Sequence, residues 1–172
     1  MIQIRERDLS ARELFSLVEH VAGIASKANA SLLVNDRADI AASLGCGVHL
    51  PARSLPASAV RNAFGPEMLI GASTHNIEEA QDAESGGADF IVFGPVFATE
   101  SKKTYGPPVG LETLRAVSGR SRIPVLALGG IKLTNFQDAL RAGAAGVAAI
   151  SLFTEAGDLE ALVRRIKNLP GE

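Results

Sequence analysis

The stretch "RAGAAGVAAI", residues 141–150, passes from the end of a helix to the start of a strand within a few residues. Gly143 stands where the helix is expected to stop, because glycine readily adopts the left-handed backbone that closes a helix C-terminus. The apolar residues that follow predict a buried strand almost immediately afterwards. A helix that leads directly into a buried strand is the repeating unit of an α/β fold.

The same alternation extends in both directions along the chain. Short apolar runs occur at residues 2–4, 31–34, 47–50, 69–71, 90–93, 124–128 and 146–150. Several are continuous rather than alternating, which is typical of parallel strands covered on both faces. Amphipathic stretches separate most of them, and Leu14, Leu17, Val18 and Val21 have the spacing of a helix with one buried stripe. The pattern predicts right-handed βαβ units throughout.

Two helix starts are marked by capping-box pairs, Ser10 with Glu13 and Asn76 with Glu79. The chain has 172 residues and contains no linker, low-complexity tract or shift of composition. Residues 1–172 are therefore expected to form a single domain.

A doubly wound sheet and a (β/α) barrel both fit this alternation. A closed (β/α)8 barrel of the TIM type has one more strand than the seven candidates found here. If the fold is a barrel, it is therefore expected to lack the first βα unit. Its first strand would then have a free edge, and free edges beside exposed apolar residues favour association. On that reasoning we expect a homo-oligomer.

Composition narrows the class of partner. The formal net charge of -2 gives no electrostatic case for nucleic acid or an anionic membrane. No apolar run approaches the roughly 18 residues that suggest a membrane span. The N-terminus, "MIQIRERDLS", is charged and strand-like and is interpreted as neither a signal nor a transit peptide. The single cysteine, Cys46, fits a reducing compartment, so we expect a cytoplasmic protein.

Polar residues and glycines lie near or just after the ends of the predicted strands, at the edge where α/β proteins place their active sites. In chain order they are Gln3, Arg5, Arg7, Asn35, Asp36, His49, Ser73, His75, Thr99, Ser101, Lys102, Gly129, Gly130 and Ser151. Cationic groups and hydroxyls together suit phosphate or pyrophosphate oxygens. Paired glycines before a helix also let backbone N–H groups approach an anion. The set as a whole predicts an anion site.

Individual members of this set also have structural interpretations. The paired glycines can be turn chemistry, and Asp36 can cap the helix that follows it. Lys102 and Lys103 can be a solvated charge pair. His49 lies inside an apolar run and is expected to be a packed core residue rather than an acid or base. The convergence of the set on one face therefore carries the prediction.

Longer motifs run over essentially the whole chain. They are "IQIRERDLS", "LLVNDRADIA", "GVHL", "IGASTHNIEEA", "GADFIVFGPVF", "TESKK", "ALGGI" and "GVAAIS". Together they resemble thiamine phosphate synthase and its sister group, the thiazole tautomerases. The resemblance implies a (β/α)8 barrel that joins a hydroxymethylpyrimidine pyrophosphate to a thiazole phosphate. Such a transferase of thiamine biosynthesis releases pyrophosphate, with magnesium present.

The resemblance also implies roles for single residues. Catalytic roles fall on Ser73, His75 and Lys102. The residues implied to bind the pyrimidine and its pyrophosphate are Gln3, Arg5, Arg7, Asn35, Thr99, Ser101 and Lys102. Those implied to bind the thiazole phosphate are Gly129, Gly130, Ile150 and Ser151. Asp36 is the implied magnesium ligand, and Ser54 occupies the position of a second carboxylate in the family pattern.

Two other functions fit the same residues. A thiazole tautomerase needs proton transfer rather than magnesium, and His75 would be its acid and base because histidine titrates near neutral pH. The third hypothesis is a protein that binds phosphorylated ligands and has lost its chemistry.

Overall fold

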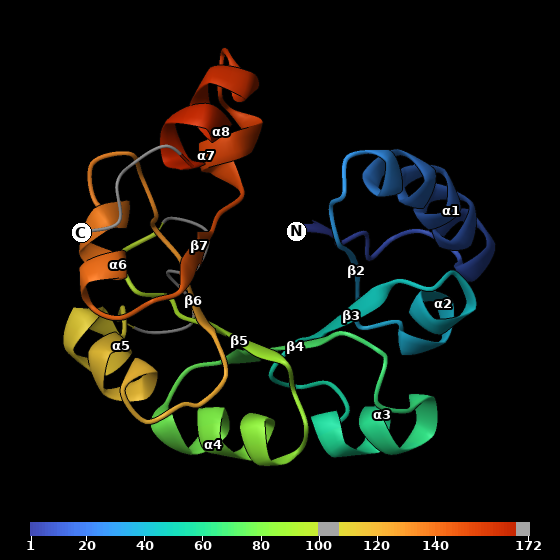
Figure 1. The fold of residues 1–172 in the computed structure, drawn as a ribbon, viewed down its shortest axis with the longest axis horizontal. Coiled ribbons are helices and arrows are strands. Elements are labelled where there is room, and N and C mark those ends of the chain that lie inside the picture. The colour runs from blue at the N-terminus through green and yellow to red at the C-terminus, as the bar shows by residue number, and fades with distance from the viewer. Residues whose placement is uncertain (100–106, 168–172) are drawn as a thin grey trace.

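The computed structural model describes residues 1–99 and 107–167, in which strands and helices alternate along the chain (Figure 1). The strands are β1 (Ile2–Ile4), β2 (Leu32–Asn35), β3 (Gly47–Leu50), β4 (Ile70–Thr74), β5 (Phe90–Phe93), β6 (Val125–Leu128) and β7 (Gly146–Ala148). The helices are α1 (Ala11–Lys27), α2 (Ala38–Ser43), α3 (Ala57–Phe64), α4 (Ile77–Ser85), α5 (Gly110–Ser118), α6 (Phe136–Arg141), α7 (Ser151–Thr154) and α8 (Leu159–Lys167). Each predicted apolar run is thus confirmed as a strand.

The seven strands form one parallel sheet in the order β1-β2-β3-β4-β5-β6-β7. Figure 1 shows the sheet curled into a half-barrel, with helices on its convex side and an opening between β1 and β7. Within the described residues, β1 and β7 are its two edges. The order excludes the doubly wound alternative, because a doubly wound sheet reverses its strand order at a switch point.

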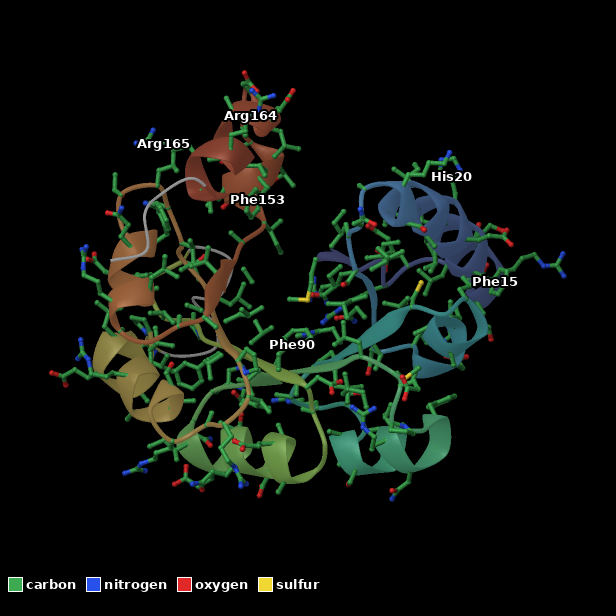
Figure 2. All side chains as sticks on the ribbon, viewed as in Figure 1. Phe15, His20, Phe90, Phe153, Arg164 and Arg165 are labelled. Atoms are coloured by element: carbon green, nitrogen blue, oxygen red, sulfur yellow. The ribbon has the colours of Figure 1, made fainter. Side chains whose placement is uncertain are left out.

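The two faces of the sheet bury different sets of apolar residues. Towards the helices, residues such as Val34, Val48 and Ile70 are fully buried. The concave side holds a smaller cluster centred on Leu33, Phe90 and Val92, and Figure 2 shows Phe90 in the middle of that side. Alternation along each strand therefore assigns every second residue to the concave side.

Two glycines make the packing on the concave side possible. A Cβ at Gly71 would lie 2.2 Å from the ring of Phe90, and one at Gly47 would lie 2.6 Å from a methyl of Leu33. Because these residues sit on neighbouring strands, the glycines leave the space that the larger side chains fill. The inner layer thus alternates small and large residues, as filled barrels do.

Both predicted helix starts are confirmed, the first with a complete capping box and the second with only the N-cap half of one. The hydroxyl of Ser10 accepts from the Glu13 amide, and the Glu13 carboxylate accepts from the Ser10 amide at 2.8 Å. The side chain of Asn76 accepts from the Glu79 amide at 2.8 Å. At the C-terminus of α6, Gly143 adopts φ +97°, and β7 begins three residues later, as the opening stretch predicts.

One arginine, Arg61 of α3, holds together the segments at the amino-terminal ends of β4 and β5. Its guanidinium donates to the backbone carbonyls of residues 65, 66, 68 and 87, at 2.7–3.1 Å. It also pairs with Asp89 at 2.8 Å, and Asp89 accepts from the amide of Ile70 at 2.6 Å. The segments that lead into β4 and β5 are thereby held to the end of α3.

None of the helices within residues 1–99 and 107–167 combines the length and the apolar character that crossing a membrane requires.

Candidate active site

The first part of the site lies where β1, β2 and β3 end. Asn35 of β2 pairs with His49 of β3, and Arg5 directly follows the last residue of β1, close enough for its charge to act on His49. The side-chain amide of Gln3 donates to the side-chain oxygen Oδ1 of Asn35 at 3.0 Å. Polar side chains from three strands therefore meet on the concave side, as the sequence predicts for an inner polar layer.

Asp36 follows β2 in a left-handed backbone conformation, with φ +61°. Aspartate and asparagine adopt this conformation more readily than other non-glycine residues. The Asp36 amide donates to the His49 carbonyl at 2.9 Å, which holds the turn. The cap of α2 falls instead on Arg37, without a side-chain hydrogen bond. Helix capping therefore does not explain Asp36.

The carboxylate of Asp36 accepts a hydrogen bond from the hydroxyl of Ser54. No group of three or more His, Cys, Asp or Glu side chains that could hold a metal ion occurs in the described part of the chain. Mg²⁺ often uses only one or two carboxylates and takes its other ligands from substrate phosphates and water. The single carboxylate of Asp36 fits that mode of binding, whereas it does not fit a metal held by protein ligands alone.

His49 and Ser73 form a hydrogen-bonded pair between β3 and β4. Nε2 of His49 lies 2.8 Å from Oγ of Ser73, and His49 is only 5% exposed. Burial, with a smaller contribution from the charge of Arg5, lowers the pKa of His49 to about 4. The sequence places His49 in the core, and this burial is confirmed. The sequence does not predict the hydrogen bond between His49 and Ser73.

β4 extends further than its apolar run predicts, because pairing with β5 continues to Thr74. Ser73 consequently lies inside a strand, whereas the sequence pattern places it after the end of that strand. His75 lies just beyond this strand, and its Nδ1 is 3.0 Å from Oε2 of Glu79 in the first turn of α4. The backbone amide of His75 donates to the same oxygen at 2.8 Å.

The second part of the site lies where β6 and β7 end. Leu128 pairs with Ala148, so the glycine pair that follows β6 and the residues that follow β7 leave the sheet at the same edge. Among the described residues, no hydrogen bond engages the backbone amides of Gly129, Gly130, Ile150 or Ser151. Unpaired N–H donors on two neighbouring strand ends can bind an anion.

The two glycines are required by their surroundings. Gly129 and Gly130 have φ +98° and +63°, which favours glycine. A Cβ at Gly129 would lie 2.5 Å from Pro95, and one at Gly130 would lie 2.4 Å from the carbonyl oxygen of Ala98. The segment after β5 thus crosses directly over this turn, and the amide of Phe97 donates to the Gly129 carbonyl at 3.0 Å.

Several predicted site residues lie apart from these two groups. Arg7 is exposed beyond the end of β1, and Thr99 is partly buried at the last described position before residue 107. Ser101 and Lys102 lie outside the described residues.

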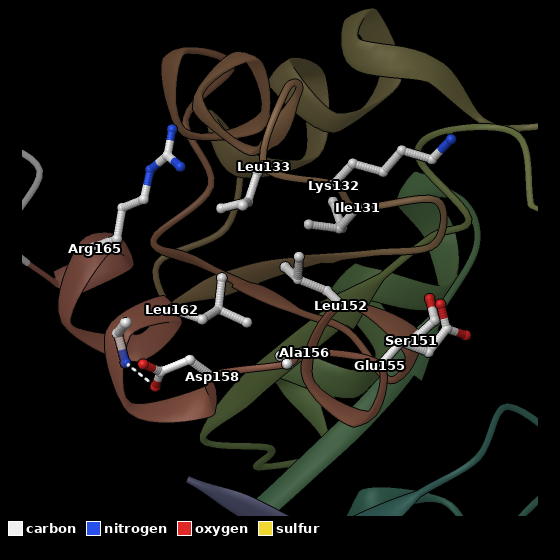
Figure 3. A pocket seen from close by; sticks show the side chains of 12 residues that line it. Ile131, Lys132, Leu133, Ser151, Leu152, Glu155, Ala156, Asp158, Leu162 and Arg165 are labelled. Atoms are coloured by element: carbon white, nitrogen blue, oxygen red, sulfur yellow. Dashed lines mark hydrogen bonds between the residues drawn. The ribbon is translucent and has the colours of Figure 1, made fainter.

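A pocket of about 570 Å³ adjoins the second part of the site (Figure 3). It is lined by the segment after β6, by α7 and by α8, and Figure 3 shows Ser151 and Lys132 at one side and Arg165 at the other. Leu152 and Leu162 form part of its apolar middle. The apolar middle of the pocket offers no donor to an anion, so the unpaired amides, including that of Ser151 at its side, are the better candidate for phosphate.

Comparison with known proteins identifies a matching family. The family model described as thiamine monophosphate synthase matches residues 1–153. A putative thiamine-phosphate synthase of Geobacter sulfurreducens is 49% identical over 151 residues, which cover 87% of this chain and 71% of that protein. The thiamine-phosphate synthase of Moorella thermoacetica is 41% identical over 169 residues, covering 98% of this chain and 80% of that protein.

A solved structure is also similar. It is the thiamine phosphate pyrophosphorylase of Pyrococcus furiosus, with a TM-score of 0.86 and 31% sequence identity. The match covers 96% of this chain and 79% of that one.

Proposed function

The chain belongs to the thiamine monophosphate synthase family, a family of transferases of thiamine biosynthesis, and from this premise we propose how its residues act. The reaction joins hydroxymethylpyrimidine pyrophosphate to a thiazole phosphate and releases pyrophosphate. One observation supports the proposal above all. Polar side chains gather at the ends of β1 to β4, and unpaired amides gather at the ends of β6 and β7, so a two-substrate reaction has two separate anchoring places.

The first step breaks the C–O bond between the pyrimidine methylene and the pyrophosphate, and the electron pair leaves with the pyrophosphate. The second step forms a C–N bond from the lone pair of the thiazole nitrogen to that methylene carbon. Arg5 and the hydroxyl of Ser73 donate to the departing pyrophosphate, on which negative charge develops. Donors fixed in advance at such a position stabilise the transition state. No residue needs to become covalently attached.

The remaining residues orient the two substrates. Gln3 and Asn35, already joined by a hydrogen bond of 3.0 Å, present amide groups to the pyrimidine. The amides of Gly129, Gly130 and Ser151 hold the thiazole phosphate, and Ile150 supplies a further amide and an exposed apolar side chain. The roles proposed for Arg7, Thr99, Ser101 and Lys102 in holding the pyrophosphate rest on the family resemblance.

Magnesium, when bound, would neutralise charge on the pyrophosphate, and Asp36 would hold it together with substrate oxygens. His75 offers a second candidate chemistry. Its Nδ1 faces the carboxylate of Glu79 at 3.0 Å, which leaves Nε2 for proton transfer in a thiazole tautomerase.

Release of pyrophosphate under steady-state conditions tests the synthase proposal. With both substrates present, the wild type is expected to release pyrophosphate. Arg5→Met is expected to lower kcat/KM about 10²-fold, the usual effect of losing a donor to developing charge. Arg12→Met, an exposed position on α1, is the matched control and is expected to change little. An Arg5→Met variant as active as this control would contradict the proposed role.

The tautomerase candidate is tested by proton exchange on a thiazole carboxylate phosphate. His75→Gln is expected to abolish such exchange if the wild type catalyses it. Exchange without pyrophosphate release would favour the tautomerase. Binding of both phosphorylated ligands without any turnover would favour a binding protein.

We further propose that residues 1–172 form one domain, because a single sheet connects all the strands. A cytoplasmic location is consistent with one free cysteine, Cys46. Self-association is proposed because the outer edges of β1 and β7 are free within the described residues, and Ile2 and Ile150 beside them are 50% and 66% exposed. A monomer at high concentration in sedimentation velocity would exclude it.

A further inference from the structure

The buried imidazole of His49 contacts Ser73, a serine on the concave side of the sheet. His49 pairs with Gly71 across β3 and β4, and Ser73 lies two residues further along β4, so all three share one face. Gly71 in turn pairs with Phe90, which marks that face as the concave one. His49 is buried, whereas Ser73 is partly exposed. The pair therefore runs from the interior towards the candidate site.

The two ring nitrogens of His49 have different surroundings. Nε2 lies 2.8 Å from the Ser73 hydroxyl, whereas Nδ1 is buried without a hydrogen-bond partner among the described residues. A proton on Nδ1 would leave a buried N–H unpaired, and such orphaned donors are rarer than unpaired acceptors. The proton therefore belongs on Nε2, which donates to Oγ of Ser73.

This tautomer determines what the serine can do. A hydroxyl has one hydrogen to donate and two lone pairs that accept. Because Nε2 donates to Ser73, the imidazole offers no lone pair that would draw the serine hydrogen inwards. That hydrogen is left to point towards the mouth of the site, where a phosphate or pyrophosphate oxygen can only accept.

We propose that His49 is a positioning residue that fixes Ser73 as a hydrogen-bond donor to the pyrophosphate group of the substrate. The proposal rests on the proposed function for the identity of that ligand. The contact of Nε2 with Ser73 and the buried, unpartnered Nδ1 together favour this one tautomer. His49 thus acts through Ser73 and does not itself touch the reacting atoms.

Nitrogen NMR of the folded protein tests the tautomer directly. The chain has three histidines, so the signals of His49 are identified by their loss in His49→Gln. At neutral pH we expect a protonated Nε2 and an unprotonated Nδ1, because only Nε2 has a hydrogen-bond partner among the described residues. A proton on Nδ1, or exchange between the two tautomers, would overturn the proposal.

A double-mutant cycle on pyrophosphate affinity tests the coupling. Inorganic pyrophosphate is the probe, and calorimetry gives its Kd for the wild type, His49→Leu, Ser73→Ala and the double variant. Each single substitution is expected to weaken binding roughly tenfold, the effect of losing one hydrogen bond to a charged group. The double variant is expected to bind no more weakly than Ser73→Ala alone. Additive losses would overturn the proposal, because they would mean that His49 acts independently of Ser73.

His49→Gln provides the rescue. Its amide nitrogen can donate where Nε2 does, so it is expected to recover most of the affinity that His49→Leu loses. If His49→Leu does not fold, His49→Gln and Ser73→Ala still decide: a Gln variant as weak as Ser73→Ala would overturn the proposal.

The outcomes separate this proposal from the proposed function. If the wild type shows no synthase turnover, the proposed function is refuted. The tautomer of His49 and the double-mutant cycle on pyrophosphate affinity still test the positioning role of His49. A wild type that does not bind pyrophosphate overturns both the ligand assigned to Ser73 and the role of His49.

Discussion

Replacing Arg61 with methionine should lower stability strongly without affecting the chemistry. Arg61 ties the end of α3 to the segments that enter β4 and β5, at the end of the sheet opposite the candidate site. Its side chain is 19% exposed. Methionine keeps much of the aliphatic length but leaves four carbonyls and the Asp89 carboxylate without their donor.

The expected loss follows from these contacts. Removing one partner of a buried ion pair costs about 3–5 kcal/mol. Asp89 is 39% exposed and keeps the Ile70 amide, so it can be rehydrated and the loss should lie near the lower end. We therefore expect the free energy of unfolding to fall by about 3 kcal/mol, or the Tm by about 6–12 °C for a chain of this size. Arg61→Lys should recover little, since one ammonium cannot reproduce the fork.

Urea unfolding with an unchanged m-value measures this loss of stability. Measuring kcat/KM under conditions in which the variant is fully folded then shows whether its catalytic activity is unchanged. Arg141→Met is the matched control, because the Arg141–Asp138 pair is 65% and 43% exposed. Such a surface pair contributes about 0–1 kcal/mol. An Arg61→Met variant no less stable than this control would refute the reasoning. Unequal activity of the folded variants would show that the two ends of the sheet are coupled.

Three further predictions concern the site and the helices. Gly130→Ala should weaken binding of thiazole phosphate at least tenfold by calorimetry, because its Cβ would collide with the Ala98 carbonyl, whereas Gly45→Ala, which shares positive φ but has open space, should leave affinity unchanged. Because burial lowers the pKa of His49 to about 4, the unfolded chain binds a proton at this histidine between pH 6.5 and 4 and the folded protein does not. The free energy of unfolding should therefore fall by up to roughly 1.4 kcal/mol per pH unit as the pH is lowered through this interval. In urea titrations, His49→Gln should reduce this dependence on pH. Equal slopes for the two proteins would contradict this. Ser10→Ala should cost about 1 kcal/mol of stability through loss of the α1 cap; a neutral result would mean that water replaces it.

Much of the fold could be predicted because a sheet buried on both faces leaves a strong mark on the sequence. Continuous runs such as "FIVF" at residues 90–93 indicated parallel strands, and Ser10 and Asn76 fixed two helix starts. Parallel strands end at one edge, so the polar residues that follow them could be expected to converge. Gln3 and Asn35 do meet in this way.

The contacts that escaped prediction join positions far apart in the sequence. In "GVHL" both faces of the strand are apolar, so periodicity could not show that His49 faces the site or that Ser73, 24 residues later, is its partner. Had the register of β3 with β4 been known, the alternation of side chains would have found it. Arg61 left no signal either, because it mostly bonds backbone carbonyls, which every residue carries.

The central claim, that this chain joins the two phosphorylated substrates, is tested most directly by identifying the products. The folded wild type is incubated with hydroxymethylpyrimidine pyrophosphate, thiazole phosphate and magnesium, and both products are quantified by mass spectrometry. We predict thiamine phosphate and pyrophosphate in equal amounts, with neither formed when one substrate is omitted. Pyrophosphate released without thiamine phosphate, or no product from a protein that binds both substrates, would contradict the account.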